Sequence, residues 1–111
     1  MIRKLIGILV LASPVLAFGQ FETEVAAGLQ PTHVVTPRVP SEFRGKEAEV
    51  NVILKLNRDG TVGAVEVQDA TDTEHATSVI NAVREWRFEP AGEEAAERKV
   101  LLPVRFVASN N

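Results

Sequence analysis

The side chains that could carry out chemistry are few in this sequence, and most lie near the start of a predicted helix. His75 follows Asp72 by three residues, so the two could share a helix face and hold a metal ion. A zinc site takes at least three protein ligands, and no third ligand accompanies this pair. We therefore interpret His75 as a structural or solvent-exposed residue and His33 as a loop residue. We predict no metal site and no cofactor.

Acid–base and nucleophilic chemistry have little support. Asp69, Asp72 and Glu74 cluster at the predicted helix start, where the positive end of the helix dipole stabilises carboxylates. This explains the cluster without an acid–base pair. No serine stands in a context that resembles a nucleophile elbow, and the sequence has no cysteine. The acidic stretch 91–97 is interpreted as a solvated loop. We predict that the chain is not an enzyme.

The first 19 residues differ from the rest of the 111-residue chain. They begin with the basic pair Arg3-Lys4, continue with an apolar run and end with small residues near Gly19. These are the parts of a secretory signal peptide, so we predict that residues 1–19 are cleaved off before Gln20. The apolar run is shorter than the roughly 20 residues that span a membrane. We therefore predict a periplasmic protein, with an uncleaved inner-membrane anchor as the alternative.

Removal of that segment leaves 92 residues, and the loss of Arg3 and Lys4 changes the net charge from −3 to −5. A chain of this length holds one small domain, which must build its core without disulfides. The acidic balance argues against nucleic acid as a partner, because no basic stripe is present to neutralise phosphates.

An antiparallel hairpin is the clearest element of the sequence. Residues 47–56 alternate apolar and polar side chains, which is typical of a half-buried strand. Asn57-Arg58-Asp59-Gly60 then predicts a turn in which Gly60 takes a positive φ. Residues 61–69 form the return strand. Its apolar residues change phase near the start, so we expect a bulge near Gly63.

One long helix is predicted after the hairpin. Thr71 and Glu74 have the spacing of a capping box, in which each side chain satisfies an otherwise free backbone N–H. The residues that recur at three- and four-residue spacing and predict one buried face are Ala76, Val79, Ile80, Val83 and Trp86. Glu89-Pro90 ends the helix or a short extension of it, because a residue before proline disfavours helical geometry. We interpret Trp86 and Phe88 as core residues.

The last predicted strand runs from Arg98 to Val107 and has the features of a sheet edge. Pro103 has no backbone N–H, so it is tolerated at an edge and unfavourable in the centre of a sheet. Charges such as Lys99 and Arg105 protect an edge strand from random pairing. We therefore predict that this strand lies at the edge of the sheet.

These elements predict a small α+β domain over residues 37–107. We expect an antiparallel three-stranded sheet, one long helix and a short N-terminal helical turn at Pro40–Arg44, which Gly45 closes. Residues 20–36 lack strong periodicity and are predicted to form an extended lead-in. Residues 108–111 are a frayed tail.

Three segments of the chain resemble the C-terminal domain of TonB, the periplasmic end of a Gram-negative energy-transducing protein. They are the hairpin from Val50 to Val67, the run from Ala82 to Ala91, and the closing Pro103-Val104-Arg105-Phe106. The most specific stretch is Trp86, Arg87, Phe88, Glu89 and Pro90, where a helix runs into an extended exit. We interpret these five residues as mainly structural.

The resemblance implies that the domain grips a short peptide near the N-terminus of an outer-membrane transporter. In this mode the peptide adds as a strand beside the last strand of the domain, and main-chain hydrogen bonds supply the affinity. The matching positions are Arg98, Lys99, Val100, Leu101, Leu102, Pro103, Val104, Arg105 and Phe106. The implied function is a TonB-like protein-binding module linked to TonB-dependent transmembrane transport.

The sequence departs from the energy-transducing members of that family. Those members have a membrane helix and a long proline-rich spacer, whereas the 18 residues from Gly19 to Thr36 reach only about 60 Å at ~3.3 Å per residue. The expected partner is an outer-membrane transporter peptide or another envelope protein. The alternative is a structural envelope protein that binds cell wall or associates with itself through the edge strand, as a homodimer, without energy transduction.

Overall fold

The computed structural model describes residues 15–18, 21–25, 29–90 and 99–108. Most of the predicted signal peptide, the predicted loop at 91–97, Arg98 and the end of the tail lie outside these residues. In chain order the elements are β1 (Val15–Phe18), β2 (Phe21–Glu24), β3 (Pro31–His33), η1 (Ser41–Phe43), β4 (Ala48–Leu56), β5 (Val62–Ala70), α2 (Thr73–Val83), β6 (Arg87–Phe88) and β7 (Lys99–Phe106).

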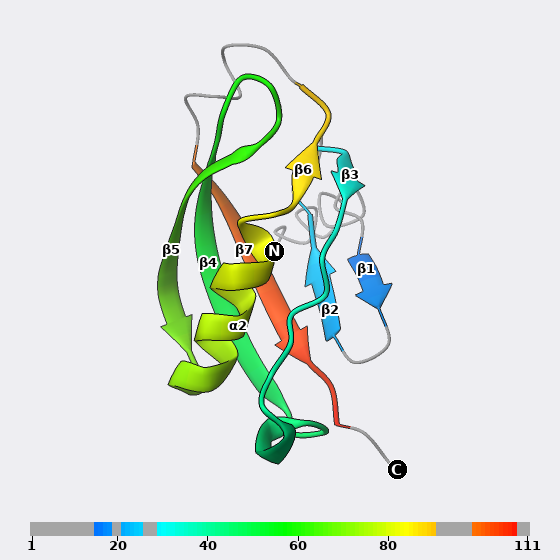
Figure 1. Cartoon of the computed structure of the whole chain (residues 1–111), viewed down its shortest axis with the longest axis vertical. Coiled ribbons are helices and arrows are strands. Elements are labelled where there is room, and N and C mark those ends of the chain that lie inside the picture. The colour runs from blue at the N-terminus through cyan, green and yellow to red at the C-terminus, as the bar shows by residue number, and fades with distance from the viewer. Residues whose placement is uncertain (1–14, 19–20, 26–28, 91–98, 109–111) are drawn as a thin grey trace, which may run out of the picture.

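The strands form one large antiparallel sheet and a small second one. The large sheet has the order β1-β2-β7-β4-β5, and β3 pairs with β6 in the small one. The helix α2 crosses one face of the large sheet, against β4 and β5 (Figure 1). The α+β class is confirmed, and α2 is the one long helix among the described residues. The large sheet has five described strands, so the prediction of a three-stranded sheet was wrong.

The core lies between α2 and the inner face of the sheet. β4 lies between β7 and β5, and the alternation of its side chains buries Val50, Val52 and Leu54 completely. The helix contributes Val79 and Val83, which are also fully buried. The predicted buried faces of the strand and of the helix are therefore confirmed, and they meet each other.

The turn between β4 and β5 has the predicted geometry. Gly60 has a φ of +93°, and its N–H donates to the carbonyl of Asn57 at 3.0 Å. The carboxylate of Asp59 accepts bonds from the hydroxyl and the backbone N–H of Thr61 at 2.7 and 3.0 Å. These bonds, the hydroxyl first, lower the pKa of Asp59.

The predicted bulge is present at Gly63. Lys55 pairs with Ala64 and Leu56 pairs with Val62, so Gly63 is the extra residue on β5. A second irregularity, which we did not predict, leaves Gln68 without a partner in the β4–β5 register. Both lie on β5, which is an edge strand of the sheet.

The predicted capping box of Thr71 and Glu74 was wrong, because another residue caps the helix. The N-cap is Asp72, whose carboxylate accepts the N–H of His75 at 2.7 Å. The hydroxyl of Thr71 instead accepts the N–H of Glu49 at 2.9 Å. Thr71 is therefore used to attach the end of β5 to β4, and the next residue takes over the cap.

The helix ends earlier than the sequence indicates. Its last residue is Val83, and the N–H groups of Glu85 and Trp86 close tight turns onto the carbonyls of Ala82 and Val83. Trp86 lies beyond the helix, where its ring is still buried. The role of Trp86 in the core is confirmed, and its place within the helix was wrong.

The edge prediction for the last strand was also wrong. β7 lies between β4 and β2, because β4 pairs along one side of β7 and β2 pairs with the other side. Pro103 is accommodated because its carbonyl faces β2, where it accepts the hydroxyl of Thr23 at 2.6 Å. The N–H and C=O of one residue in an antiparallel strand face the same neighbour, so the missing N–H of Pro103 costs no bond to β4.

Candidate partner-binding edge

The candidate site is the side of β7 that faces β2. Three residue pairs join the two strands: Phe21 with Phe106, Glu22 with Arg105, and Thr23 with Val104. No other described strand pairs with this side of β7, so residues 99–103 have no register partner there. β2 therefore pairs with three of the eight residues of β7.

The side chains of β7 divide between the core and the surface. The four that face the core are buried: Val100, Leu102, Val104 and Phe106. On the other face Lys99 and Arg105 are exposed, Pro103 is half-buried and Leu101 is 49% exposed. Of the nine predicted site residues, the structure thus brings eight onto one strand, and Arg98 lies outside the described residues.

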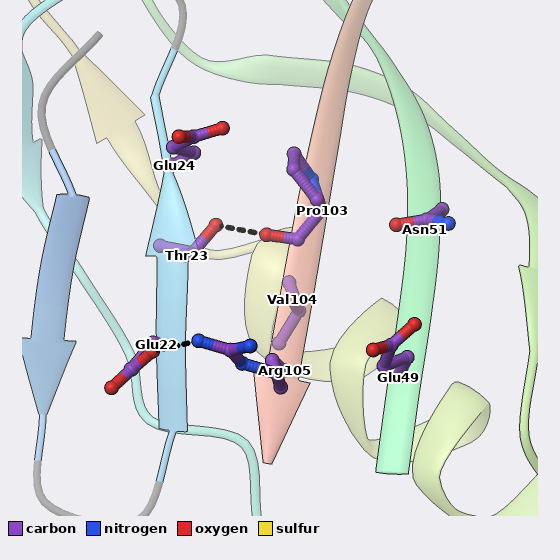
Figure 2. A pocket seen from close by; sticks show the side chains of 8 residues that line it. All are labelled: Glu22, Thr23, Glu24, Glu49, Asn51, Pro103, Val104 and Arg105. Carbon is purple, nitrogen blue, oxygen red and sulfur yellow. Dashed lines mark hydrogen bonds and ion pairs between the residues drawn. The ribbon is translucent and has the colours of Figure 1, made fainter. Parts of the chain in front are cut away.

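A shallow groove of about 280 Å³ lies over this junction. Figure 2 shows the residues that line it, which come from β2, β7 and β4: Glu22, Thr23, Glu24, Glu49, Asn51, Pro103, Val104 and Arg105. Carboxylates predominate among the charged side chains, and the one cation among these lining residues belongs to β7.

Arg105 is the electrostatic centre of the groove. It is 61% exposed and forms an ion pair with Glu22 across the β2–β7 junction, with 2.7 Å between the nitrogen and the oxygen. On its other side it is the register partner of Glu49 on β4. The bond to Glu22 and then the nearby charges, Glu49 among them, raise the pKa of Arg105 above its usual value. The guanidinium of Arg105 therefore lies between the register positions of two carboxylates, Glu22 on β2 and Glu49 on β4.

The stretch Trp86–Pro90, which resembles the family motif, places two aromatic rings in the core. Trp86 donates its ring N–H to the carbonyl of Val35 at 2.9 Å and packs against Phe88 with 6.2 Å between ring centroids. The N–H of Phe88 donates to the carbonyl of Gly60 at 2.8 Å. Both rings are buried, whereas Arg87, Glu89 and Pro90 are exposed. The stretch thus joins the hairpin turn to the lead-in segment.

A comparison with protein families identifies the fold. The family described as the Gram-negative bacterial TonB protein C-terminal matches residues 41–108 of the chain. The chain belongs to this family. TonB C-terminal domains are non-catalytic interaction modules, periplasmic in Gram-negative bacteria and linked to TonB-dependent transport.

A solved structure agrees with this assignment. The solution NMR structure of the Pseudomonas aeruginosa TonB C-terminal domain has a TM-score of 0.52 and 22% sequence identity to this chain. The match covers 75% of this chain and 88% of the Pseudomonas chain. No curated protein matches the chain by sequence. In the part of the chain that the structure describes, no helix has the length and apolar character to span a membrane.

His75 is a buried residue of helix α2. It is 1% exposed, its Nδ1 lies 2.8 Å from a carboxylate oxygen of Asp72, and its ring packs against those of Phe43 and Phe106. Burial acts to raise the pKa of Asp72, but the hydrogen bonds from the backbone and ring of His75 outweigh it and lower that pKa. Among the described residues no three His, Cys, Asp or Glu side chains gather as a metal site would require.

The sequence analysis missed β2, although a signal for it was present. Phe21, Thr23 and Val25 are buried, and Glu22 and Glu24 between them are only partly so. This is the alternation of a strand with one buried face. The run is short and follows the predicted cleavage point directly, so it was included in the lead-in.

Proposed function

We propose that this chain is a periplasmic TonB-like protein-binding module in which β7 takes up a partner peptide as an added strand. The partner is an N-terminal peptide of an outer-membrane transporter or a similar extended segment of an envelope protein. The module does not catalyse a reaction, and its contribution to transport is the physical grip on that peptide.

The observation that supports this function is the β2–β7 pairing itself. The side of β7 away from β4 accepts an extended segment in regular antiparallel register, with an ion pair at Arg105 and a hydroxyl bond at Pro103. Strand addition uses the same main-chain bonds and the same alternate side-chain positions. Residues 99–103, which have no register partner on β2, continue this side of the strand and offer a peptide further length.

We also propose that the chain is exported with residues 1–19 as a cleavable signal peptide. The described part of that segment, β1, pairs with β2 alone and lies at the end of the sheet. Its removal leaves β2, β7, β4 and β5 in their order and makes β2 the outermost strand on that side.

A peptide titration tests the binding function. The isotope-labelled chain is titrated with N-terminal peptides of outer-membrane transporters, and we expect amide shifts at residues 99–106. β5 is the internal control, because it is the opposite edge strand and shares no pairing with β7. Shifts of equal size on β5 and β7, or no shifts with a broad set of peptides, would overturn the proposal.

A further inference from the structure

We infer that the peptide-binding side of β7 is self-occluded: β2 is an intramolecular stand-in for the partner, and capture requires β2 to leave. This inference rests on the proposed function, since it assigns the regulation of the same site. It predicts that binding is limited by the release of the chain's own strand.

The first support is that β2 already makes the contacts that an added strand would make. Phe21 is buried beside Phe106, with 6.4 Å between ring centroids, and Thr23 is buried opposite Val104. Outside the core, Glu22 pairs with Arg105. Backbone register, apolar anchor and charge partner are therefore all supplied from within the chain.

The second support is the place of β2 in the chain. The family match begins at residue 41, so β2 lies outside the part of the chain that corresponds to the family, whereas β7 lies within it. The strand β7 lies within the matched region, and β2 is contributed by a segment that precedes it. Such a position fits a strand that can leave β7 while the matched domain stays folded.

The third support is that β2 is weakly attached for a strand inside a sheet. It has four residues, and only three of them pair with β7. Its ion pair lies on an exposed arginine, where water screens the attraction. The attachment that must be broken is therefore mainly the burial of Phe21 and Val25.

The same contacts describe the chemistry of a competing peptide. It must place an apolar side chain in the site of Phe21, an acidic one opposite Arg105 and a hydroxyl near the carbonyl of Pro103. A synthetic peptide with the sequence of residues 20–29 meets all three requirements and serves as a defined probe.

A reversible cross-link tests the inference on the full chain. Thr23→Cys with Val104→Cys places two thiols opposite each other in the register at little change in volume, and the native sequence has no other cysteine. We expect that the oxidised form does not bind the 20–29 peptide and that reduction restores binding. If the oxidised form binds as tightly as the reduced form, β2 does not occlude the site.

A variant that loosens β2 gives the opposite effect. Phe21→Ala removes the main apolar anchor, and we expect at least tenfold tighter binding of the 20–29 peptide than to the wild-type chain. Val83→Ala is the matched control, because it truncates a fully buried residue on α2, which is not part of the β2–β7 junction. If Phe21→Ala gives no gain, or Val83→Ala gives the same gain, self-occlusion is refuted.

The two proposals fail in different ways. If Phe21→Ala binds the 20–29 peptide but no transporter peptide, self-occlusion stands and the proposed partner is wrong. If the wild-type and oxidised chains bind transporter peptides at β7 as tightly as Phe21→Ala does, the partner stands and self-occlusion is wrong.

Discussion

The backbone at Gly60 excludes any larger residue for two reasons. Its φ is +93°, and a Cβ built on it would overlap the carbonyl oxygen of Phe88, which belongs to the segment after the helix. The turn therefore reverses the chain between β4 and β5 and also packs directly against the backbone of β6.

We expect Gly60→Ala to lower the free energy of unfolding by at least about 2 kcal/mol, because left-handed strain adds to a backbone clash. Urea unfolding followed by circular dichroism measures it. Gly63→Ala is the control, since its nearest neighbour is the flexible side-chain oxygen of Asn57 and its φ is not positive. Equal losses for the two variants would contradict this account of Gly60.

Asp72 supports the helix through its charge and its cap. Replacement by Ala should cost about 1 kcal/mol at neutral pH. Because the folded state lowers the pKa of Asp72, this contribution is complete above the unfolded pKa of about 3.9 and is lost as the pH falls through the lower folded pKa.

Unfolding of wild type and Asp72→Ala at pH 7 and pH 3 measures that change. We expect the difference between them to shrink at pH 3. Asp72→Asn, which keeps an acceptor oxygen without the charge, separates the cap from the carboxylate. A difference that stays the same at both pH values would mean that the charge of Asp72 has no part in stability.

At the scale of the element, β2 depends on few contacts. The hydroxyl of Thr23 satisfies the carbonyl of Pro103, which is the residue that cannot donate a bond of its own. We expect Thr23→Val to weaken the β2–β7 junction by about 1 kcal/mol, the net value of one such hydrogen bond.

Amide hydrogen exchange locates that loss. Exchange should become faster in β2 and stay unchanged in the centre of β4, since local opening follows local contacts. Thr77→Val is the matched control, because Thr77 is an exposed helix residue. Faster exchange throughout β4 would indicate global destabilisation instead of release of one strand.

At the scale of the whole molecule, the position at which the mature chain begins decides whether the sheet includes β1. We expect the intact mass of the periplasmic protein to correspond to a chain that starts at Gln20. Because β1 pairs with β2 and with no other described strand, that shorter chain should unfold cooperatively, with a urea dependence close to that of the full chain.

An intact mass that includes Met1 would support the anchored alternative. A chain from Gln20 that unfolds without cooperativity would mean that β1 is required for the fold. The two measurements are independent, because the first concerns processing and the second concerns packing.

The sequence by itself determined the elements whose causes are local. The alternation of residues 48–56, the turn at Gly60, the bulge at Gly63 and the apolar stripe of α2 each follow from spacings of a few residues. The stretch Trp86–Pro90 indicated the family, and the family match confirmed it. The extent of β7 followed from the same alternation.

Only the tertiary structure decided which strand lies beside which. The bond from Thr23 to Pro103 joins residues 80 positions apart, and the bond from Trp86 to Val35 joins residues 51 apart. Alternation shows which face of a strand is buried, but the N–H and C=O groups along its sides are alike in every sequence. The sequence therefore predicted β7 as a strand, and only the packing of Phe21 and Val25 into the core placed β2 on the side where a partner was expected.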